Sequence, residues 1–445
     1  MKGDFSRMTW DPAKHYTRVL MQQGRVLLDS DWNEMVEINV AETRAFIVSA
    51  IGPHAAVEGA FKLAPVNDAN GAAKPFELSC SAGDYFVGGI RCELAEGLLY
   101  SQAEGAAEPL EESKNYLAYL EVCERHVTSY EDEDAQELSV SFLEVALRGP
   151  DTTTRTQTSL RVRTLPLEQG PPNPLDVWKT NYSAFLQQLE AARRLRSTTV
   201  ELAARASIPA GADSPCAIPP ESSYRGVENQ LYRVEVQKPG ALDEATLLWS
   251  RDNGSVIFPV DSIKDTKVTV RSLGRDVSRS LKKGDSVQVS DDVSAASGRT
   301  DNLFEVAEVD PETLTVTLSA AVPSELARDP LRHPLLRRWD SQGAVPLPAF
   351  DGDVSEWMDL EDGVQIRLRL RDGATAQLMT GDYWLIPART ATGDVEWPGT
   401  RSDPKFLAPH GVHCYYAPLG VVSIDGQGIP TVTTDLRRVI KQNWE

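Results

Sequence analysis

The apolar and polar positions near the start of the chain predict a short apolar strand followed by one long helix. Asp31 is a candidate N-cap, and Glu34 stands three residues later, where it completes a capping box. No glycine or proline follows until Gly52 and Pro53, which predicts a helix of about 20 residues, roughly 30 Å long. The arm before it, residues 1–23, has scattered apolar residues and no core of its own. We therefore expect the arm and the helix to bury apolar surface on another body.

Most of the remaining chain shows the period-two alternation of β-strands. The clearest case is residues 364–370, where apolar residues alternate with Gln365, Arg367 and Arg369 and give one apolar and one basic face. We expect the basic face to pair with acidic loops of this protein or of a neighbour. Asn253 and Gly254 follow another strand and suit a type I′ turn, which needs positive φ at both central positions.

Two stretches rich in proline and glycine, residues 166–174 and 208–220, are predicted linkers. Between them, apolar residues at alternating spacings of three and four predict a helix over residues 175–206 with a short heptad pattern. Either this helix packs on the chain's own sheet, or it associates with its copies in a trimeric or hexameric collar. Four short strands within residues 263–322 indicate an inserted SH3-like or OB-like barrel, interpreted as a spacer or contact module.

These patterns predict a mainly β, multidomain α+β protein with an N-terminal arm and long helix, β domains, a helical linker and an inserted small β-barrel. The expected units are residues 1–53 (attachment arm and helix), 54–165 (β domain), 166–220 (linker with an amphipathic helix), 221–262 with 323–445 (second β domain) and 263–322 (barrel).

The formal net charge of −20 argues against partners that are nucleic acids or anionic lipid surfaces. Residues 1–28 differ from the rest, because they hold five basic and two acidic residues. This segment could dock on an acidic neighbour, including another copy of the chain. There is no secretory h-region and no run of 18 apolar residues, so we expect neither a signal peptide nor membrane insertion. The expected location is the cytoplasm at synthesis, with release by lysis as part of a larger particle.

The chain lacks the motifs of common nucleotide-binding and hydrolytic enzymes: Walker A, the Rossmann glycine pattern, Gly-x-Ser-x-Gly and His-Glu-x-x-His. We therefore predict no enzyme activity, no catalytic residues and no cofactor. Five scattered cysteines without a CxxC pair are typical of reduced core thiols. A disulfide between Cys80 and Cys92 across a hairpin is the alternative.

Three clusters were weighed as ligand sites. His410, His413 and Cys414 offer zinc ligands, but a closed site needs four and no cysteine pair lies nearby. The acidic residues within 351–362 offer oxygen ligands, but Glu356 stands where an EF-hand needs glycine, which favours a solvated loop. We therefore expect no metal site. Tryptophans that could stack on sugars, and that more often serve as core or interface anchors, are Trp249, Trp339, Trp357 and Trp397.

Three blocks of sequence resemble a family of uncharacterised bacterial proteins (DUF6519-like) associated with phage-tail-like extracellular contractile injection systems. The blocks are residues 10–16 with 21–26 and 31–34, residues 228–235 with 249–256, and residues 381–390. The Gly-Arg-x-Leu…Asp-x-Asn-Glu pattern of residues 24–34 is also similar to the N-termini of some phage fibre and baseplate proteins. The resemblance implies no activity.

The expected function is that of a structural subunit of such a particle, at the baseplate or as a fibre-like or cage-like appendage. It would dock through its arm and helix onto baseplate or fibre proteins and form a homo-oligomer, a trimer or a hexamer. The predicted contact residues are Trp10, Tyr16, Arg25, Val26, Leu27, Leu28, Trp32, Met35, Ile38 and Val48. The alternative is a surface module that binds or cleaves glycans.

Overall fold

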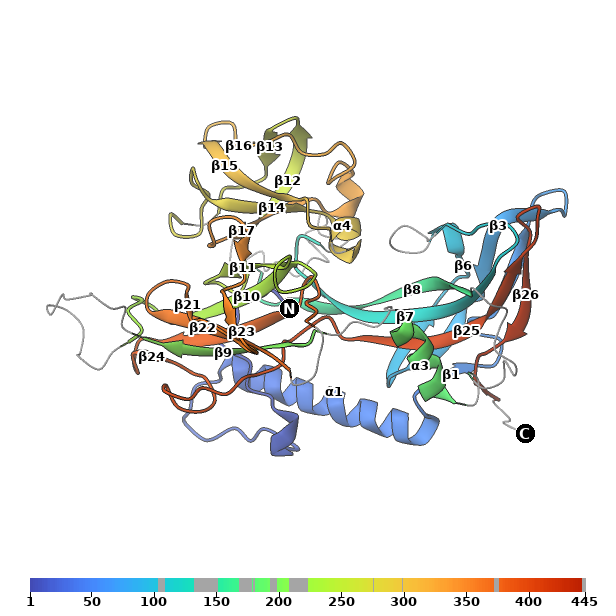
Figure 1. Cartoon of the computed structure of the whole chain (residues 1–445), viewed down its shortest axis with the longest axis horizontal. Coiled ribbons are helices and arrows are strands. Elements are labelled where there is room, and N and C mark those ends of the chain that lie inside the picture. Colours follow the sequence, from blue (N-terminus) through green and yellow to red (C-terminus); the bar gives the residue numbers. More distant parts are fainter. Residues whose placement is uncertain are drawn as a thin grey trace, which may run out of the picture.

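The computed structural model describes residues 1–102, 109–131, 151–167, 178, 181–192, 198–207, 223–274, 276–297, 299–371 and 376–441. These residues form a mainly β structure of several sheets with one long helix, as the alternation predicts. Figure 1 shows the sheets in two groups side by side, a barrel above one of them, and the long helix running beneath both. In the part of the chain described, no helix is both long and apolar enough to cross a bilayer.

The long helix α1 (Asp29–Ile51) spans 23 residues and ends at Gly52, as predicted. Its start differs from the prediction, because α1 begins at Asp29 and the N-cap position is Leu28, whose side chain makes no capping bond. Asp31 is therefore not the N-cap. The carboxylate of Glu34 accepts a hydrogen bond from the Thr9 hydroxyl at 2.5 Å. At the other end, the amide of Gly52 donates to the carbonyl of Val48, and Gly52 has a φ of 103°.

Three antiparallel ladders join the longest strands into one sheet in the order β26-β25-β7-β8. The strands are β7 (Asn115–Val127), β8 (Arg155–Leu167), β25 (Cys414–Ile424) and β26 (Pro430–Asp435). Strands from residues 115–167 and 414–435, far apart in the sequence, therefore hold this part of the molecule together. One face packs on two smaller sheets, built from β1 (His54–Val57), β4 (Gly83–Val87), β5 (Ile90–Leu94) and β27 (Val439–Ile440), and from β2 (Leu63–Asn67), β3 (Ala73–Cys80) and β6 (Leu98–Leu99).

The cysteines agree with the sequence-based interpretation of reduced core thiols at Cys80 and Cys92, but not at Cys123 and Cys414. Cys123 on β7 and Cys414 on β25 stand directly opposite each other and form a disulfide. Cys80 and Cys92 are free, buried thiols in the core of this half of the molecule, so the proposed bridge between them is wrong. Burial raises the pKa of both thiols to about 12, which keeps them protonated.

The second predicted helix is shorter than expected. Helix α3 covers Tyr182–Ala191, whereas β9 (Val200–Ala206) is a strand, so the helical prediction for 200–206 is wrong. Residues 175–177, 179–180 and 193–197 of this prediction lie outside the described residues, as do 168–174 and 208–220 of the two predicted linkers. Phe185 and Leu189 of α3 pack on the outer face of the long sheet, against Leu117 and Tyr119 of β7. This helix therefore covers the chain's own sheet, the first of the two alternatives.

Two sheets share the next core, and the first contains strands from two of the three sequence blocks, those at 228–235 with 249–256 and at 381–390. The first contains β18 (Val345–Pro346), β11 (Thr246–Ser250), β10 (Gln230–Lys238), β23 (Tyr383–Arg389) and β24 (Asp394–Val395). The second contains β19 (Phe350–Asp351), β20 (Val354–Ser355), β22 (Val364–Leu370), β21 (Met358–Asp359) and β9. Strand β22 confirms the alternation prediction, since Val364, Ile366 and Leu368 are buried.

Six further strands pair in the order β12-β13-β16-β15-β14-β17 and close into a barrel, because β17 pairs back with β12. They are β12 (Ile257–Lys264), β13 (Lys267–Val270), β14 (Ser286–Ser290), β15 (Leu303–Asp310), β16 (Thr315–Leu318) and β17 (Leu335–Trp339), with α4 (Asp292–Ser297) after β14. The turn between β11 and β12 has the predicted conformation, with φ of 53° at Asn253 and 66° at Gly254.

Candidate docking surface

The first seven residues lie in a seam between the barrel, the β10–β23 ladder and the end of β7, and we call them the N-terminal clasp. The ammonium of Lys2 lies 2.9 Å from a carboxylate oxygen of Glu235 and 5.4 Å from the ring centre of Trp339. The side-chain amide of Asn253 donates to the carbonyl of Gly3 at 2.8 Å. Figure 1 places the N-terminus in the middle of the molecule. Residues 1–7 therefore pack against the rest of this chain. The sequence analysis expected the arm to bury its apolar surface on another body.

The seam under the clasp contains buried charged side chains that form ion pairs with one another. Arg233 is 2% exposed, donates to Glu235, and its guanidinium carbon lies 3.5 Å from the ring centre of Tyr383. Burial alone would raise the pKa of Glu235, but the charges of Arg233 and Lys2 lower it to about 2. Burial lowers the pKa of Lys2 to about 8, against the opposing pull of Glu235. A buried carboxylate with two cationic partners fixes the clasp at one place.

The segment after the clasp returns to the body, so that residues 8–28 form a closed loop, which we call the docking loop. At its base, the Ser6 amide and hydroxyl donate to the Asp29 carboxylate at 2.8 and 2.6 Å. Burial would raise the pKa of Asp29, but these bonds and those from nearby amides hold it below its usual value. Arg7 pairs with Glu396 at 3.0 Å on the clasp side. The docking loop is thus tied down at both ends.

Helix α1 is fixed to the body along one side only. Ile38 is 2% exposed, and Arg44 pairs with Glu124 of β7 at 2.6 Å. The backbone approaches closely at Gly89, where an added Cβ would lie 2.7 Å from the Cα of Arg44. The opposite side of α1 carries Trp32 and Phe46, which are 64% and 73% exposed. This leaves three large apolar side chains, Trp32, Val36 and Phe46, open to solvent on that side of α1.

The predicted contact residues differ in how much of each side chain is exposed to solvent. Those that lie open on the docking loop or α1 are Tyr16, Arg25, Val26, Leu27, Leu28, Trp32 and Val48. Trp10 and Met35 are half-buried, and Ile38 lies in the interior, so these three offer less surface. Sequence reasoning missed Leu20, Met21 and Phe46, which are 73%, 54% and 73% exposed. The helical period could have found Phe46, because it shares the face of Trp32 and Val36.

Several of the residues considered as metal ligands have other partners. Cys414 is in the disulfide, and burial lowers the pKa of His410 to about 4 while its backbone pairs with Tyr383. Among the acidic residues of 351–362, Glu361 accepts from Arg251 at 2.8 Å and from the Tyr232 hydroxyl at 3.1 Å. Within the described ranges no group of three or more acidic, histidine or cysteine side chains could hold a metal ion.

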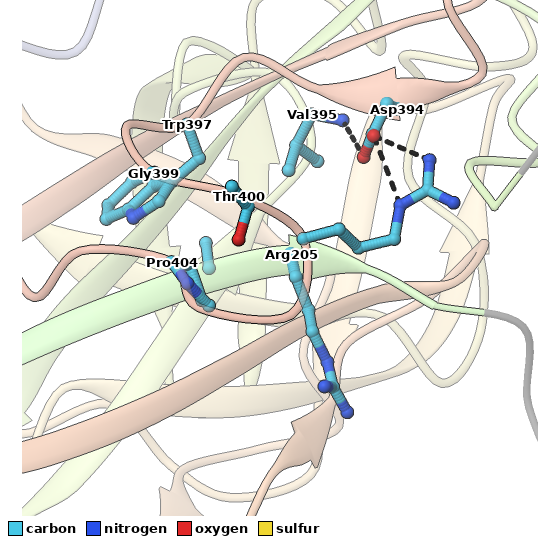
Figure 2. A pocket seen from close by; sticks show the side chains of 9 residues that line it. Arg205, Asp394, Val395, Trp397, Gly399, Thr400 and Pro404 are labelled. Carbon is cyan, nitrogen blue, oxygen red and sulfur yellow. Dashed lines mark hydrogen bonds and ion pairs between the residues drawn. The ribbon is translucent and has the colours of Figure 1, made fainter.

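The four tryptophans considered for stacking on sugars also differ in their burial and neighbours. Trp339 is 1% exposed, and Trp249 packs at the edge of the sheet core. Trp357 lies under the guanidinium of Arg205. Trp397 lines a pocket of about 220 Å³ between β9, β24 and the turn at 397–404, together with Arg205, Thr400 and Arg401. Arg401 donates to Asp394 at 2.6 Å, and Figure 2 shows the Arg205 side chain directed away from Asp394.

Comparison with known proteins gives one match. No curated protein and no solved structure shows significant similarity to this chain. The model of a family of unknown function, DUF6519, matches residues 1–173 and 177–431, which include the clasp, the docking loop, α1 and nearly every strand described. The chain therefore belongs to the DUF6519 family.

Proposed function

We propose that this protein is a structural subunit that docks onto neighbouring subunits through the docking loop and the outer face of α1. The observation that carries the proposal is the concentration of open apolar side chains on a segment tied down at both ends. Val26, Leu20 and Phe46 are each more than 70% exposed. Exposed apolar side chains gathered in one region are typical of interaction sites, whereas scattered single ones are not.

The closure of the loop favours a preformed docking element over a segment that folds on binding. Ser6 and Asp29 hold the base of the loop, and the clasp and Arg44 hold the flanking segments. A preordered element loses less conformational entropy on binding, so more of the apolar burial appears as affinity. The docking loop carries three basic residues and one acidic residue, which suits a partner surface that is apolar and acidic.

We propose a phage-tail-like contractile injection particle as the assembly, at its baseplate or as a fibre-like or cage-like appendage. This rests on the resemblance of the pattern in residues 24–34 to the N-termini of some phage fibre and baseplate proteins. In such a particle the subunit would be present as symmetric copies, a trimer or a hexamer, would have no enzyme activity, and would leave the cell by lysis.

The direct test is to tag the C-terminus, recover the protein from native lysate, and examine the eluate by electron microscopy. Particles with a contractile tail and the tag at a fixed position support the proposal. A lone species without particles or partner subunits contradicts it. Deleting residues 1–51 is a poor test, because it also removes Lys2 from Glu235 and Ile38 from the interior.

A further inference from the structure

The outward residues of α1 follow a heptad spacing. Positions at alternating intervals of four and three form one stripe along a helix, and such stripes join the helices of coiled coils. All six residues of this stripe are exposed, and Figure 1 shows the sheets on one side of α1 only. The residues of the α1 stripe are Trp32, Val36, Asn39, Thr43, Phe46 and Ala50. A straight stripe about 27 Å long suits another helix as its partner.

The two polar residues in the middle of the α1 stripe already have partners within the helix. The side-chain amide of Asn39 donates to the carbonyl of Met35 at 2.9 Å. The hydroxyl of Thr43 donates to the carbonyl of Asn39 at 2.8 Å. Burying a polar group is costly mainly when its hydrogen bonds are lost. A second helix can therefore cover the middle of the stripe at a small polar cost.

The α1 stripe is complementary to itself when a second copy runs antiparallel. A twofold axis midway along the stripe pairs each residue of one half with a residue of the other half. The facing pairs are Trp32 with Ala50, Val36 with Phe46, and Asn39 with Thr43. Each apolar pair sets a larger side chain against a smaller one, which is how well-packed helix layers are filled, and the polar residues face each other. In a parallel pair, each residue would face its own copy, so two tryptophans would share one layer.

The charges around α1 also favour an antiparallel copy. The chain has a net charge of −20, so two copies repel over most of their surface, whereas the α1 stripe holds no charged residue. The docking loop, at the start of α1, carries Lys14, Arg18 and Arg25 against Asp11. An antiparallel copy brings the end of its α1 to this loop, and the last turn of α1 holds no basic residue. Basic side chains stabilise a helix C-terminus, where the carbonyls carry a partial negative charge.

The exposed area predicts a weak pair. Trp32, Val36 and Phe46 are 64%, 45% and 73% exposed. Since a whole aromatic side chain buries about 150–250 Å², these three residues offer on the order of 400 Å² per copy. A standard stable interface buries about 800 Å² per partner. We therefore expect the stripe alone to associate at micromolar concentrations.

We propose that the α1 stripe packs antiparallel against the α1 stripe of a second copy of this chain. This inference rests on the proposed function, because it names the partner of a surface assigned there to docking. Of the two oligomers proposed, a hexamer with twofold axes contains this contact, whereas a trimer does not. A helix of a different subunit is the competing occupant, and the match of the stripe to itself favours the second copy.

The test is sedimentation velocity of the full chain at about 5 to 200 µM, a range that covers micromolar dimers. A dimer that Trp32→Ala and Ala50→Trp each weaken at least fivefold supports the proposal. The double variant exchanges the larger and the smaller side chain of one facing pair, so its dimer should be within twofold of the original. A loss of helix stability would not give this rescue. Leu331→Ser, at an 85% exposed position near the barrel, should change the affinity less than twofold.

Cysteine cross-linking under mild oxidation tests the direction of the pair. A mixture of Asn39→Cys and Thr43→Cys proteins should give at least fivefold more mixed dimer than either protein gives of its own dimer. The reason is that a disulfide needs Cβ atoms within about 4.5 Å, and only the antiparallel pair places these two positions opposite each other. Cross-links mainly between like positions would overturn the antiparallel arrangement.

Two sedimentation results would also overturn the proposal. The first is a chain that stays monomeric at 200 µM. The second is a dimer whose affinity does not follow the exchange of Trp32 and Ala50. If the chain is monomeric but its binding to the native assembly still depends on Trp32 and Phe46, then α1 docks on a different subunit. In that case the proposed function stands and the self-pairing is wrong.

Discussion

Ser6 donates two hydrogen bonds to the carboxylate of Asp29, one from its amide at 2.8 Å and one from its hydroxyl at 2.6 Å. The two residues stand 23 positions apart, and this contact closes the base of the docking loop where α1 begins. Before this contact in the chain, the clasp lies among buried charged side chains. After it, α1 packs on the sheets. Between them, the apolar residues of the loop stay open.

Replacing Asp29 with alanine should loosen the loop without unfolding the protein. The change removes both acceptors of Ser6, while the buried partners of the clasp remain. We expect trypsin to cleave faster at Lys14, Arg18 and Arg25. The free energy of unfolding should fall by only about 1 kcal/mol, the usual contribution of such bonds. Glu42→Gln on the exposed side of α1 is the matched control. Equal cleavage rates in all three proteins would mean that Ser6 and Asp29 do not hold the loop.

Replacing Glu235 with alanine should destabilise the whole protein. It leaves the buried Arg233 and the Lys2 ammonium without their carboxylate. Breaking a buried ion pair by removing one partner costs about 3–5 kcal/mol. Urea denaturation measures the loss, and Glu228→Ala, an exposed carboxylate before β10, should change stability little. A loss below about 1 kcal/mol for Glu235→Ala would show that the clasp does not depend on this pair.

The same pair gives a specific response to acid. The pKa of Glu235 is about 2 in the folded protein and about 4.5 in the unfolded chain, so between these pH values the unfolded chain binds one more proton. The contribution of Glu235 to the free energy of unfolding is complete above about pH 4.5. As the pH falls toward 2, up to about 3 kcal/mol of this contribution is lost. Denaturation curves at several pH values should therefore show a shallower acid slope for Glu235→Gln. Parallel slopes for the two proteins would contradict the assignment.

The disulfide should contribute measurably to stability. It joins positions 291 apart in the sequence, on β7 and β25. A native disulfide that closes a long loop typically stabilises the folded protein by about 2–5 kcal/mol. Reduction with a phosphine, or Cys123→Ser, should lower the free energy of unfolding by that amount, and the reductant should have no further effect on the variant. Peptide mapping of the untreated protein should recover the Cys123–Cys414 linkage. A native protein with both thiols free to alkylation would contradict it.

The sequence predicted features that depend on local pattern. The alternation over β22 and the Asn253–Gly254 turn were found because each reflects the period or the φ angles of neighbouring residues. Strand β9 was missed, since its leucine and alanines suit a helix and only the pairing with β22 makes it a strand. The start of α1 was misplaced because Asp29 and Glu34 bind Ser6 and Thr9, which no helical rule anticipates.

Contacts between residues far apart in the chain were not predicted from the sequence. Lys2 and Glu235 are 233 positions apart, and nothing in the local pattern marks either as buried. The pairing of Cys123 with Cys414 follows from the β7–β25 register, which one sequence does not reveal. The exposed residues of the docking loop were partly predicted, because an apolar segment without its own core must lie on something or stay open.

The most direct test of the docking account is to change the open apolar residues and leave the clasp intact. Trp32→Ser combined with Phe46→Ser alters two exposed side chains on the outer face of α1. Leu331→Ser, at an 85% exposed position near the barrel, is the control. Each tagged protein is expressed in the source cells, and its co-sedimentation with the native assembly is measured. The account predicts at least a tenfold loss for the α1 double variant and no loss for the control, with unchanged melting of both. Full co-sedimentation of the double variant would contradict it.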